Sequence, residues 1–379
     1  RQLITDADID AVVSVLKSDY LTQGPAVAEF EKQFAKYIGC SYAVAVSNGT
    51  AALHLCTLAL NVNATTRVIT TPITFSASAN CVRYCGGEVF FADIDPQTLL
   101  LDIHKVQELL ERYPKGYFHG IIPVDFGGNA VDMEAFRKLA DTFNCWIIED
   151  ACHAPGGFFT DSKNQQQNCG NGKFADLAIF SFHPVKHIAT GEGGMITTNN
   201  KALYEKLLLL RTHGITKDNT SFKNPKTEIT QGPWYYEMQE LGFNYRLTDF
   251  QAALGTSQLS RANENLERRK AIAKKYDNAF KNTAVHTPFA GTGHAYHLYI
   301  IQVPNRNDLY EHLRNHGIFP QIHYIPVHLM PYYQQLGHRK GQQPYSEAYY
   351  EKCISIPMYH SLNDEDQEYV IQTILTFSS

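Results

Sequence analysis

The sequence lacks the features that mark membrane, nucleic-acid-binding and metal-binding proteins. Among its 379 residues no apolar run approaches the about 20 residues that a membrane-spanning helix needs, and no secretory signal is recognisable. The net charge of −5 gives no general basic field for nucleic acid. The eight cysteines form no CxxC pair, which argues against a zinc or redox motif. We therefore expect a cytoplasmic protein that binds no membrane, nucleic acid or metal.

Two glycine-rich phosphate motifs are also missing. The chain has no GxGxxG, the fingerprint of a nicotinamide-dinucleotide domain, and no GxxxxGK[ST], the fingerprint of a P-loop. The strand and helix pattern described next would otherwise permit a nicotinamide-dependent dehydrogenase. The missing fingerprint argues against that class.

The chain does contain a regular alternation of short apolar segments and helical segments. Such alternation predicts an α/β fold with a mostly parallel sheet covered on both faces. Because the chain exceeds the size of a single core, we expect a large domain over 1–255 and a smaller α/β domain over 256–379. Ligands in such sheets bind at the carboxyl ends of the strands. The expected strands are 42–46, 67–71, 87–93, 120–125, 145–150, 177–182 and 194–198, and the helices between them are 50–60, 73–83, 103–112, 132–143 and 201–213.

The pattern changes after the last of these helices. A polar stretch over 214–242 is too long for a simple connection and suggests a functional or mobile loop. A long helix is then expected over 248–280, capped by Thr248 or Asp249. A strand over 295–303, a helix over 307–316, an extended segment over 319–328 and two closing helices complete the small domain.

An acid and a lysine at strand ends form the strongest chemical signal. Asp150 ends the apolar segment "CWIIED", and Lys186 follows another apolar segment in "FSFHPVKHIATGEGG". Taken singly, Asp150 is equally explained as a helix cap and Lys186 as a surface loop residue. Together at matching strand ends they suit pyridoxal phosphate (PLP). A desolvated lysine can bind its aldehyde, and a carboxylate can keep its ring nitrogen protonated.

Two further segments could contact the same ligand. In "VSNGTAAL", Asn48, Gly49 and Thr50 lie between a strand and a helix, where backbone amides attract a phosphate. An ordinary helix cap explains that motif equally well. Phe75 follows a strand end, where it could stack on a flat ring or belong to the core.

Polar residues in the second half of the chain are more ambiguous. Asn244 and Arg246 lie in a turn before the long helix and could simply fix that turn. His323 and His328 are five residues apart with Pro326 between them, which is poor spacing for two ligands of one metal ion. No metal site is expected from them.

These segments, in this order, resemble the sugar-nucleotide aminotransferases of the DegT/DnrJ/StrS family. The resemblance runs over nearly the whole chain and implies the type I fold of PLP-dependent transferases, the fold of aspartate aminotransferase. No single segment would be specific for this family, but the segments taken together are specific for it. They are "LTQGP" (21–25), "SNGTAAL" (47–53), "TPITFSASAN" (71–80), "EDACHA" (149–154), "FSFHPVKHIATGEGG" (180–194), "GFNYRLTDFQAALG" (242–255) and "HYIPVH" (323–328).

The resemblance implies a role for each matching residue. Lys186 corresponds to the catalytic lysine that binds the cofactor covalently and moves protons, and Asp150 to the partner of the pyridine nitrogen. Asn244 corresponds to an asparagine that reaches the cofactor phosphate of the neighbouring subunit, which implies a homodimer with shared active sites. The remaining cofactor-binding residues would be Gly49, Thr50, Ala51, Phe75, His153 and Ser181, and the substrate-binding residues Asp19, Tyr20, Leu21, Thr22, Gln321, Ile322, His323 and Tyr324.

Within the family the chain most resembles the transaminases of pseudaminic acid synthesis. Those enzymes move an amino group from glutamate to C4 of a UDP-linked 4-keto-6-deoxy-N-acetylhexosamine. The alternatives are an aminotransferase for a 3-keto sugar, a perosamine-type 4-keto sugar or a keto-inositol, and a non-catalytic, PLP-binding regulatory relative. A dehydratase of the family would carry histidine in place of Lys186, so the sequence argues against that activity.

Overall fold

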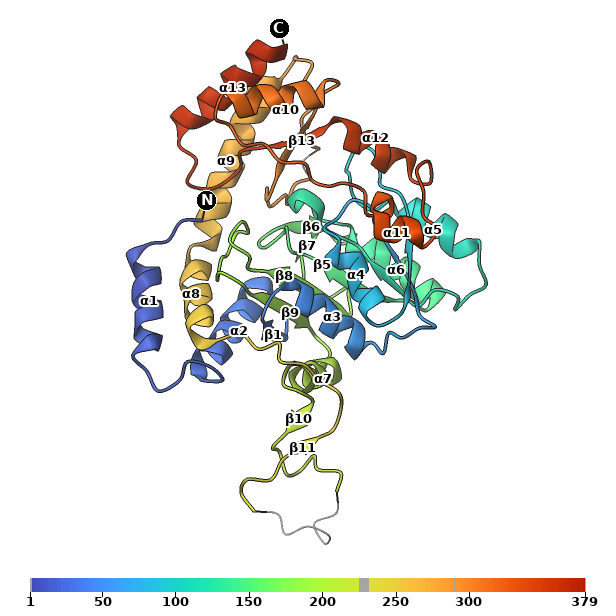
Figure 1. The fold of residues 1–379 in the computed structure, drawn as a ribbon, viewed down its shortest axis with the longest axis vertical. Coiled ribbons are helices and arrows are strands. Elements are labelled where there is room, and N and C mark those ends of the chain that lie inside the picture. The colour runs from blue at the N-terminus through green and yellow to red at the C-terminus, as the bar shows by residue number, and fades with distance from the viewer. Residues whose placement is uncertain (1, 225–231, 290, 379) are drawn as a thin grey trace.

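A seven-stranded sheet forms the centre of the protein (Figure 1). The computed structural model describes residues 2–224, 232–289 and 291–378. The strand order is β1-β9-β8-β5-β4-β2-β3, and only β9 runs antiparallel to its neighbours. The expected α/β fold with a mostly parallel sheet is therefore confirmed. The strands are β1 (Tyr42–Val46), β2 (Arg67–Thr70), β3 (Glu88–Phe91), β4 (Gly120–Ile122), β5 (Trp146–Asp150), β8 (Leu177–Ser181) and β9 (Gly194–Thr198).

Helices cover both faces of this sheet because its strands are apolar on both sides. In β1, Val44 and Val46 pack into one core with α3, α4 and α7, whereas Ala43 and Ala45 pack into a second core with α2 and α8. Helices α5 and α6 cover the rest of that second face. The helices of the large domain are α1 (Asp6–Leu16), α2 (Pro25–Ile38), α3 (Gly49–Ala59), α4 (Ala77–Tyr84), α5 (Ile103–Glu111), α6 (Met133–Phe143), α7 (Lys201–Arg211) and α8 (Asp249–Ser260), with a short 3-10 helix η1 (Phe126–Gly128).

A smaller unit lies beyond one end of the sheet, at the top of Figure 1. Its core is built from α9, α10, α13 and the antiparallel pair β12–β13, and begins at Ile272. The first turns of α9 still pack into the large domain through Ala262 and Leu266. The division at 255/256 stays a prediction. The elements of this part are α9 (Ala262–Phe280), β12 (Tyr299–Gln302), α10 (Arg306–Asn315), η2 (Val327–Leu329), α11 (Pro331–Gln335), α12 (Pro344–Lys352), β13 (Cys353–Ile356) and α13 (Asp364–Ser378).

The single long helix expected over 248–280 is wrong. Thr248 does cap α8, in a capping box with Gln251, but the helix ends at Ser260 and α9 begins at Ala262. Arg261 between them leaves helical geometry, with φ −106° and ψ 5°. Its guanidinium contacts the buried Asp8 carboxylate of α1 at 2.8 Å, so an ion pair holds the break in place.

The polar stretch over 214–242 forms an arm that projects from the large domain at the bottom of Figure 1. Strands β10 (Ile215–Thr216) and β11 (Glu237–Met238) pair at its base. Residues 225–231 of this stretch lie outside the described residues. Besides β10 and β11, three short strands were not expected from the sequence, namely β13 and the hairpin of β6 (Phe158–Thr160) and β7 (Gln166–Asn168). Of the helices in the described ranges, none is long and apolar enough to cross a membrane.

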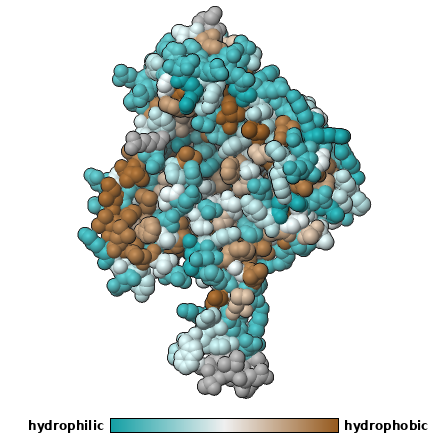
Figure 2. Space-filling model, in the orientation of Figure 1, coloured by the Kyte–Doolittle hydropathy of each residue, from teal (hydrophilic) through white to brown (hydrophobic). Residues whose placement is uncertain are grey.

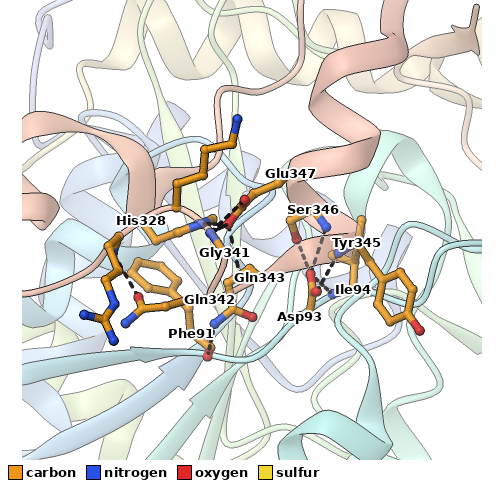
Figure 3. A network of polar contacts seen from close by, with 12 residues as sticks. Phe91, Asp93, Ile94, His328, Gly341, Gln342, Gln343, Tyr345, Ser346 and Glu347 are labelled. Atoms are coloured by element: carbon orange, nitrogen blue, oxygen red, sulfur yellow. Dashed lines mark hydrogen bonds and ion pairs between the residues drawn. The ribbon is translucent and has the colours of Figure 1, made fainter. Parts of the chain in front are cut away.

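Buried polar contacts fasten the α11–α12 segment to the large domain (Figure 3). Asp93, just after β3, accepts hydrogen bonds from the backbone N–H groups of Tyr345 and Ser346 at 2.8 and 2.9 Å and from the Ser346 hydroxyl. These amides belong to the first turn of α12, where backbone N–H groups have no carbonyl acceptor within the helix. Glu347 on the same helix contacts His328 at 3.0 Å. The segment is therefore held firmly beside the sheet.

Replacing Asp93 with alanine tests this anchoring. The change leaves buried amides of α12 without an acceptor, so Asp93→Ala should lower the free energy of unfolding by about 2 kcal/mol in urea titrations. Asp95→Ala is the control, because Asp95 bonds only within its own turn. A loss no greater than that of the control would show that the Asp93 contacts do not anchor the segment.

Candidate active site

The carboxyl ends of β5 and β8 meet at a cavity of about 640 Å³. The two strands are parallel neighbours, with Asp150 opposite Ile179, so Asp150 and Ser181 come to the same edge. The first turn of α3, the segment after β2 and Lys186 also line the cavity. The sequence-based expectation that Asp150 and Lys186 share one pocket is therefore met by the structure.

Asp150 is 5% exposed, and the chain satisfies both of its carboxylate oxygens. Oδ2 accepts a hydrogen bond from the Ser78 hydroxyl at 2.6 Å, and Oδ1 accepts one from the backbone N–H of Cys152 at 3.1 Å. Ser78 is itself paired with the hydroxyl of Thr74 at 2.8 Å. Hydrogen bonds of this kind favour the charged form of a buried carboxylate. They also fix its orientation in the cavity.

The Lys186 amine lies in surroundings that disfavour its charged form. Burial lowers the pKa of Lys186, and the nearby Asp150 carboxylate opposes that shift. Its Nζ lies 3.4 Å from Nε2 of His297, which precedes β12. A lysine whose pKa is lowered by burial is more often neutral and therefore more nucleophilic.

The first turn of α3 offers free donors at the cavity wall. Asn48 caps the helix by accepting a hydrogen bond from the Ala51 N–H at 2.8 Å. The N–H groups of Gly49 and Thr50 have no carbonyl partner within the helix, as is general for a first turn. A side chain at Gly49 would place its Cβ 3.1 Å from the Cβ of Ser181, so glycine permits this close approach. Donors at a helix N-terminus suit an anionic group.

His153, Tyr324 and Phe75 form another wall of the cavity. The Gly127 N–H donates to Nδ1 of His153 at 3.2 Å, and Nε2 of His153 lies 3.3 Å from the Tyr324 hydroxyl. Burial and the Lys186 charge hold the pKa of His153 well below its usual range. The neutral ring therefore carries its proton on Nε2 and donates it to Tyr324. Phe75 is 60% exposed at the rim, with its ring 6.3 Å from that of Tyr324.

The residues expected to bind the substrate do not all reach this cavity. His323 and Tyr324 line it, and His323 Nδ1 lies 2.8 Å from the Ser355 hydroxyl. Gln321 instead pairs through its backbone with Ser355, and Ile322 packs against the small-domain core. The segment over 19–22 connects α1 to α2 and is exposed outside the cavity. It consists of Asp19, Tyr20, Leu21 and Thr22.

Asn244 is also exposed and does not line the cavity, although the next residue, Tyr245, does. Its backbone forms an isolated bridge to Thr212 at the base of the arm. The cavity of one chain therefore lacks the asparagine that the sequence resemblance assigns to a cofactor phosphate.

Sequence reasoning missed Ser78, Tyr245 and His297. Ser78 lies in a helix and His297 in a predicted strand, and a polar residue carries no special signal in either place. Only the tertiary contacts of Ser78 with Asp150 and of His297 with Lys186 set them apart. Tyr245 follows Asn244 in a segment already noted as irregular, and its hydroxyl pairs with His54 at 3.2 Å.

A second acidic group lies behind the cavity. Asp125, Glu149 and Cys169 are buried with their ligand-type atoms within 4.8 Å of one another, a spacing that a metal ion would also require. Burial raises the pKa of Asp125 to about 7, and burial together with the Asp125 charge raises that of Glu149 well above its usual range. Two adjacent buried carboxyl groups that share one proton account for this arrangement.

Comparison with known proteins gives a consistent result over the whole chain. The profile of the family described as DegT/DnrJ/EryC1/StrS aminotransferases matches residues 2–375. The chain is 37% identical to the spore coat polysaccharide biosynthesis protein SpsC of Bacillus subtilis, over 98% of this chain and 94% of that protein. It is 36% identical to the UDP-4-amino-4,6-dideoxy-N-acetyl-beta-L-altrosamine transaminase of Campylobacter jejuni, over 99% and 96%. The PLP-form of Streptococcus pneumoniae Spr1654 superposes with a TM-score of 0.88 at 29% identity, over 100% and 97%.

The shared proton of Asp125 and Glu149 predicts a pH dependence of stability. The ordinary pKa of an aspartic acid is about 4, whereas Asp125 titrates near 7 in the fold. As the pH rises through this window, the unfolded chain releases a proton that the folded chain retains. The free energy of unfolding should therefore fall, at a slope of up to about 1.4 kcal/mol per pH unit.

Asp125→Asn should weaken this dependence, because asparagine can pair with Glu149 without holding a titratable proton. In urea unfolding at pH 5, 6, 7 and 8, the free energy of unfolding of the variant should increase relative to that of the wild type as the pH rises. Asp10→Asn, at an exposed site, is the control and should follow the wild type. A constant difference between Asp125→Asn and the wild type would contradict the shared proton.

Proposed function

We infer the function from one premise, namely that this chain belongs to the DegT/DnrJ/EryC1/StrS aminotransferase family. It is a PLP-dependent aminotransferase of the sugar-modifying kind. We propose that it moves an amino group from L-glutamate to C4 of a UDP-linked 4-keto-6-deoxy-N-acetylhexosamine, in the biosynthesis of a pseudaminic-acid-type sugar. The C. jejuni relative, whose name gives a UDP-linked amino sugar, supports this substrate class.

The observation that carries the proposal is the meeting of Lys186 and Asp150 in one cavity with the first turn of α3. The residues present fit PLP. The partly desolvated amine suits its aldehyde, the hydrogen-bonded carboxylate suits its protonated ring nitrogen, and the free amides of Gly49 and Thr50 suit its phosphate. Ala51 and Ser181 complete the phosphate cradle, and Phe75 at the rim would stack on the ring.

PLP, when bound, would supply an aldehyde that can carry an amino group and a ring that can delocalise the electrons of a breaking bond. The chain contributes the proton transfers. Lys186 would move the proton of the substrate carbon, and its lowered pKa favours the neutral amine that can accept this proton. Asp150 would meet the ring nitrogen with a carboxylate that Ser78 and the Cys152 N–H hold in place through its two oxygens.

The sugar would occupy the side of the cavity lined by His323 and Tyr324. Tyr324 receives a hydrogen bond from the neutral His153, which leaves its own hydroxyl proton free to donate to a sugar oxygen. Gln321 and Ile322 hold this segment in place from behind. A cavity of about 640 Å³ holds a cofactor and a hexose, so the nucleotide would extend over the rim.

We propose that two chains form a homodimer with shared active sites, located in the cytoplasm. Asn244 and the segment Asp19, Tyr20, Leu21 and Thr22 lie outside the cavity of their own chain and would complete that of the partner. Exposed apolar residues support this arrangement. Ile9, Val13 and Leu16 of α1 are 51%, 36% and 54% exposed, and Figure 2 shows an apolar patch over that part of the surface. Trp234 and Leu241 on the arm are 76% and 77% exposed.

The activity is tested with glutamate and a panel of keto substrates. The PLP-loaded chain should convert one equivalent of glutamate to 2-oxoglutarate without any sugar, and Lys186→Ala should lose at least about a thousandfold in rate. Lys201→Ala, an exposed lysine in a surface ion pair, is the control. The panel contains the UDP-linked 4-keto sugar, a 3-keto sugar nucleotide, a perosamine-type 4-keto sugar nucleotide and a keto-inositol.

The UDP-linked 4-keto sugar should give the highest kcat/KM of the panel and a C4 amine as product. A higher value for another member would replace the proposed substrate. No conversion of glutamate by the wild type would contradict the donor, and no transamination with any donor would favour a regulatory relative.

Complementation between two variants tests the shared site. Lys186→Ala and Asn244→Ala chains should each be strongly impaired alone, but a 1:1 mixture exchanged through the dimer should regain about a quarter of the wild-type activity. Half of the dimers are then mixed, and each mixed dimer has one intact site. Lys186→Ala mixed with Asp150→Ala is the control and should regain nothing, because both residues serve the cavity of their own chain. Equal activity of the two mixtures would contradict sharing through Asn244.

A further inference from the structure

We infer that His297 is a positioning residue for Lys186. The Nε2 atom of His297 accepts a hydrogen bond from the free amine of Lys186 and so orients the lone pair of that amine toward the cofactor. The inference rests on the proposed function, in which the amine leaves and rejoins the cofactor in every cycle. No sequence motif pointed to His297. Its role follows from the contacts that surround its ring.

The free amine has one hydrogen-bonding contact among the described residues. Lys186 Nζ lies 3.4 Å from His297 Nε2. This distance is at the long end for a hydrogen bond. A charged neighbour of the amine is Asp150, which attracts the ammonium form. If the free amine bound to Asp150, it would occupy the carboxylate that the cofactor ring needs. A second group that can hold the amine would leave this carboxylate available.

The ring of His153 packs against that of His297 but forms no hydrogen bond with it. The ring centroids are 4.3 Å apart and the planes are tilted by 35°. Both nitrogens of His153 are engaged elsewhere, by the Gly127 N–H and the Tyr324 hydroxyl. His153 therefore supports the His297 ring from one side without competing for its Nε2.

The ring of His187 is engaged through its Nε2 only, and within the described residues its Nδ1 has no hydrogen-bond partner. It lies 5.6 Å from the His297 ring, and its Nε2 donates to the Ala295 carbonyl at 2.8 Å. Within the described part of the chain, His297 Nδ1 has no hydrogen-bond partner. The amine of Lys186 is thus the one group that hydrogen-bonds the side chain of this buried histidine there.

The His297 ring is neutral in these surroundings. Burial holds the pKa of His297 well below its usual range, and the charges of Lys186 and Arg269 act in the same direction. The neighbouring rings of His153 and His187 are also kept neutral by burial. A neutral imidazole with its proton on Nδ1 presents a lone pair at Nε2. That lone pair can accept a hydrogen from Lys186 whether the amine is protonated or not.

The backbone around His297 is fixed from both domains. Arg269 of α9 donates through Nη1 to the carbonyls of Tyr296 and His297, at 3.0 and 3.3 Å. The next residue, Leu298, donates its N–H to the carbonyl of Gly127 in the large domain at 3.0 Å. Because this segment is rigid, the His297 ring keeps its position and the flexible Lys186 side chain adjusts to it.

Two substitutions of His297 separate its hydrogen bond from its bulk. In His297→Gln the terminal amide occupies roughly the place of Nε2 and can still accept from the amine. In His297→Asn the amide reaches only the place of Nδ1, so the acceptor is lost. His187→Gln is the matched control, because His187 is equally buried beside the same ring but does not contact Lys186.

The first readout needs neither cofactor nor substrate. The pH dependence of Lys186 acylation by an amine-reactive reagent is followed by mass spectrometry in the full-length chain without PLP. Loss of an acceptor destabilises the ammonium form, so the midpoint in His297→Asn should fall by about half a pH unit or more. His297→Gln and His187→Gln should keep the wild-type midpoint.

The second readout is the reaction of the PLP-loaded chain with glutamate. His297→Asn should reduce the rate at saturating glutamate by about tenfold or more, with little change in KM, because the misplaced amine affects the chemical step. His297→Gln should restore most of the rate. If the wild type does not react with glutamate, the proposed function fails while the acylation result still decides the role of His297.

The inference is overturned if His297→Asn matches His187→Gln in the acylation midpoint. A third readout covers the case in which His297→Asn does not fold. In the chain with ¹⁵N-labelled histidine, Lys186→Met should shift the Nε2 resonance of His297 and leave that of His187 in place. An unchanged His297 resonance would equally overturn the inference.

Discussion

The burial of an amine and a carboxylate at the ends of two neighbouring strands is the constraint on which the rest of the site depends. A buried charge is costly unless hydrogen bonds or an opposite charge compensate it. Asp150 obtains its compensation from Ser78 and the Cys152 N–H, whereas burial lowers the pKa of Lys186 and so favours its neutral amine. One cavity thus presents a hydrogen-bonded carboxylate beside an amine that can accept a proton.

The sheet and the small domain contribute different parts of this arrangement. The parallel pairing of β5 and β8 places Asp150 and Ser181 at one edge, and α3 brings its first turn to the same edge. The small-domain side adds His297 and the segment with His323 and Tyr324. The contacts of Asp93 with α12 hold the following α11–α12 segment to the large domain. The small-domain side of the cavity is therefore formed by segments that are hydrogen-bonded to the large domain.

Much of this could be predicted from the sequence, because the signals were local. Apolar strand segments, the turn at Asn48 and the acid at Asp150 each follow from neighbouring residues. The strands of the central sheet and the shared cavity were found where expected. The break at Arg261 could not be predicted, because it depends on an ion pair with Asp8 at the other end of the chain. The contact between Lys186 and His297 likewise joins the two domains and leaves no trace in either segment alone. In the proposed homodimer, Asn244 and residues 19–22 would complete the site of a second chain, and the sequence alone does not show how two chains would pack.

The central claim is that Lys186 is the lysine that binds the cofactor covalently, in the cavity that it shares with Asp150. Borohydride reduction of the PLP-loaded chain, followed by mass spectrometry of its peptides, tests this claim most directly, because reduction fixes the cofactor to whichever lysine holds it. The account predicts one cofactor per chain, attached to the peptide that contains Lys186. Attachment at another lysine, or at many lysines in small amounts, would contradict it.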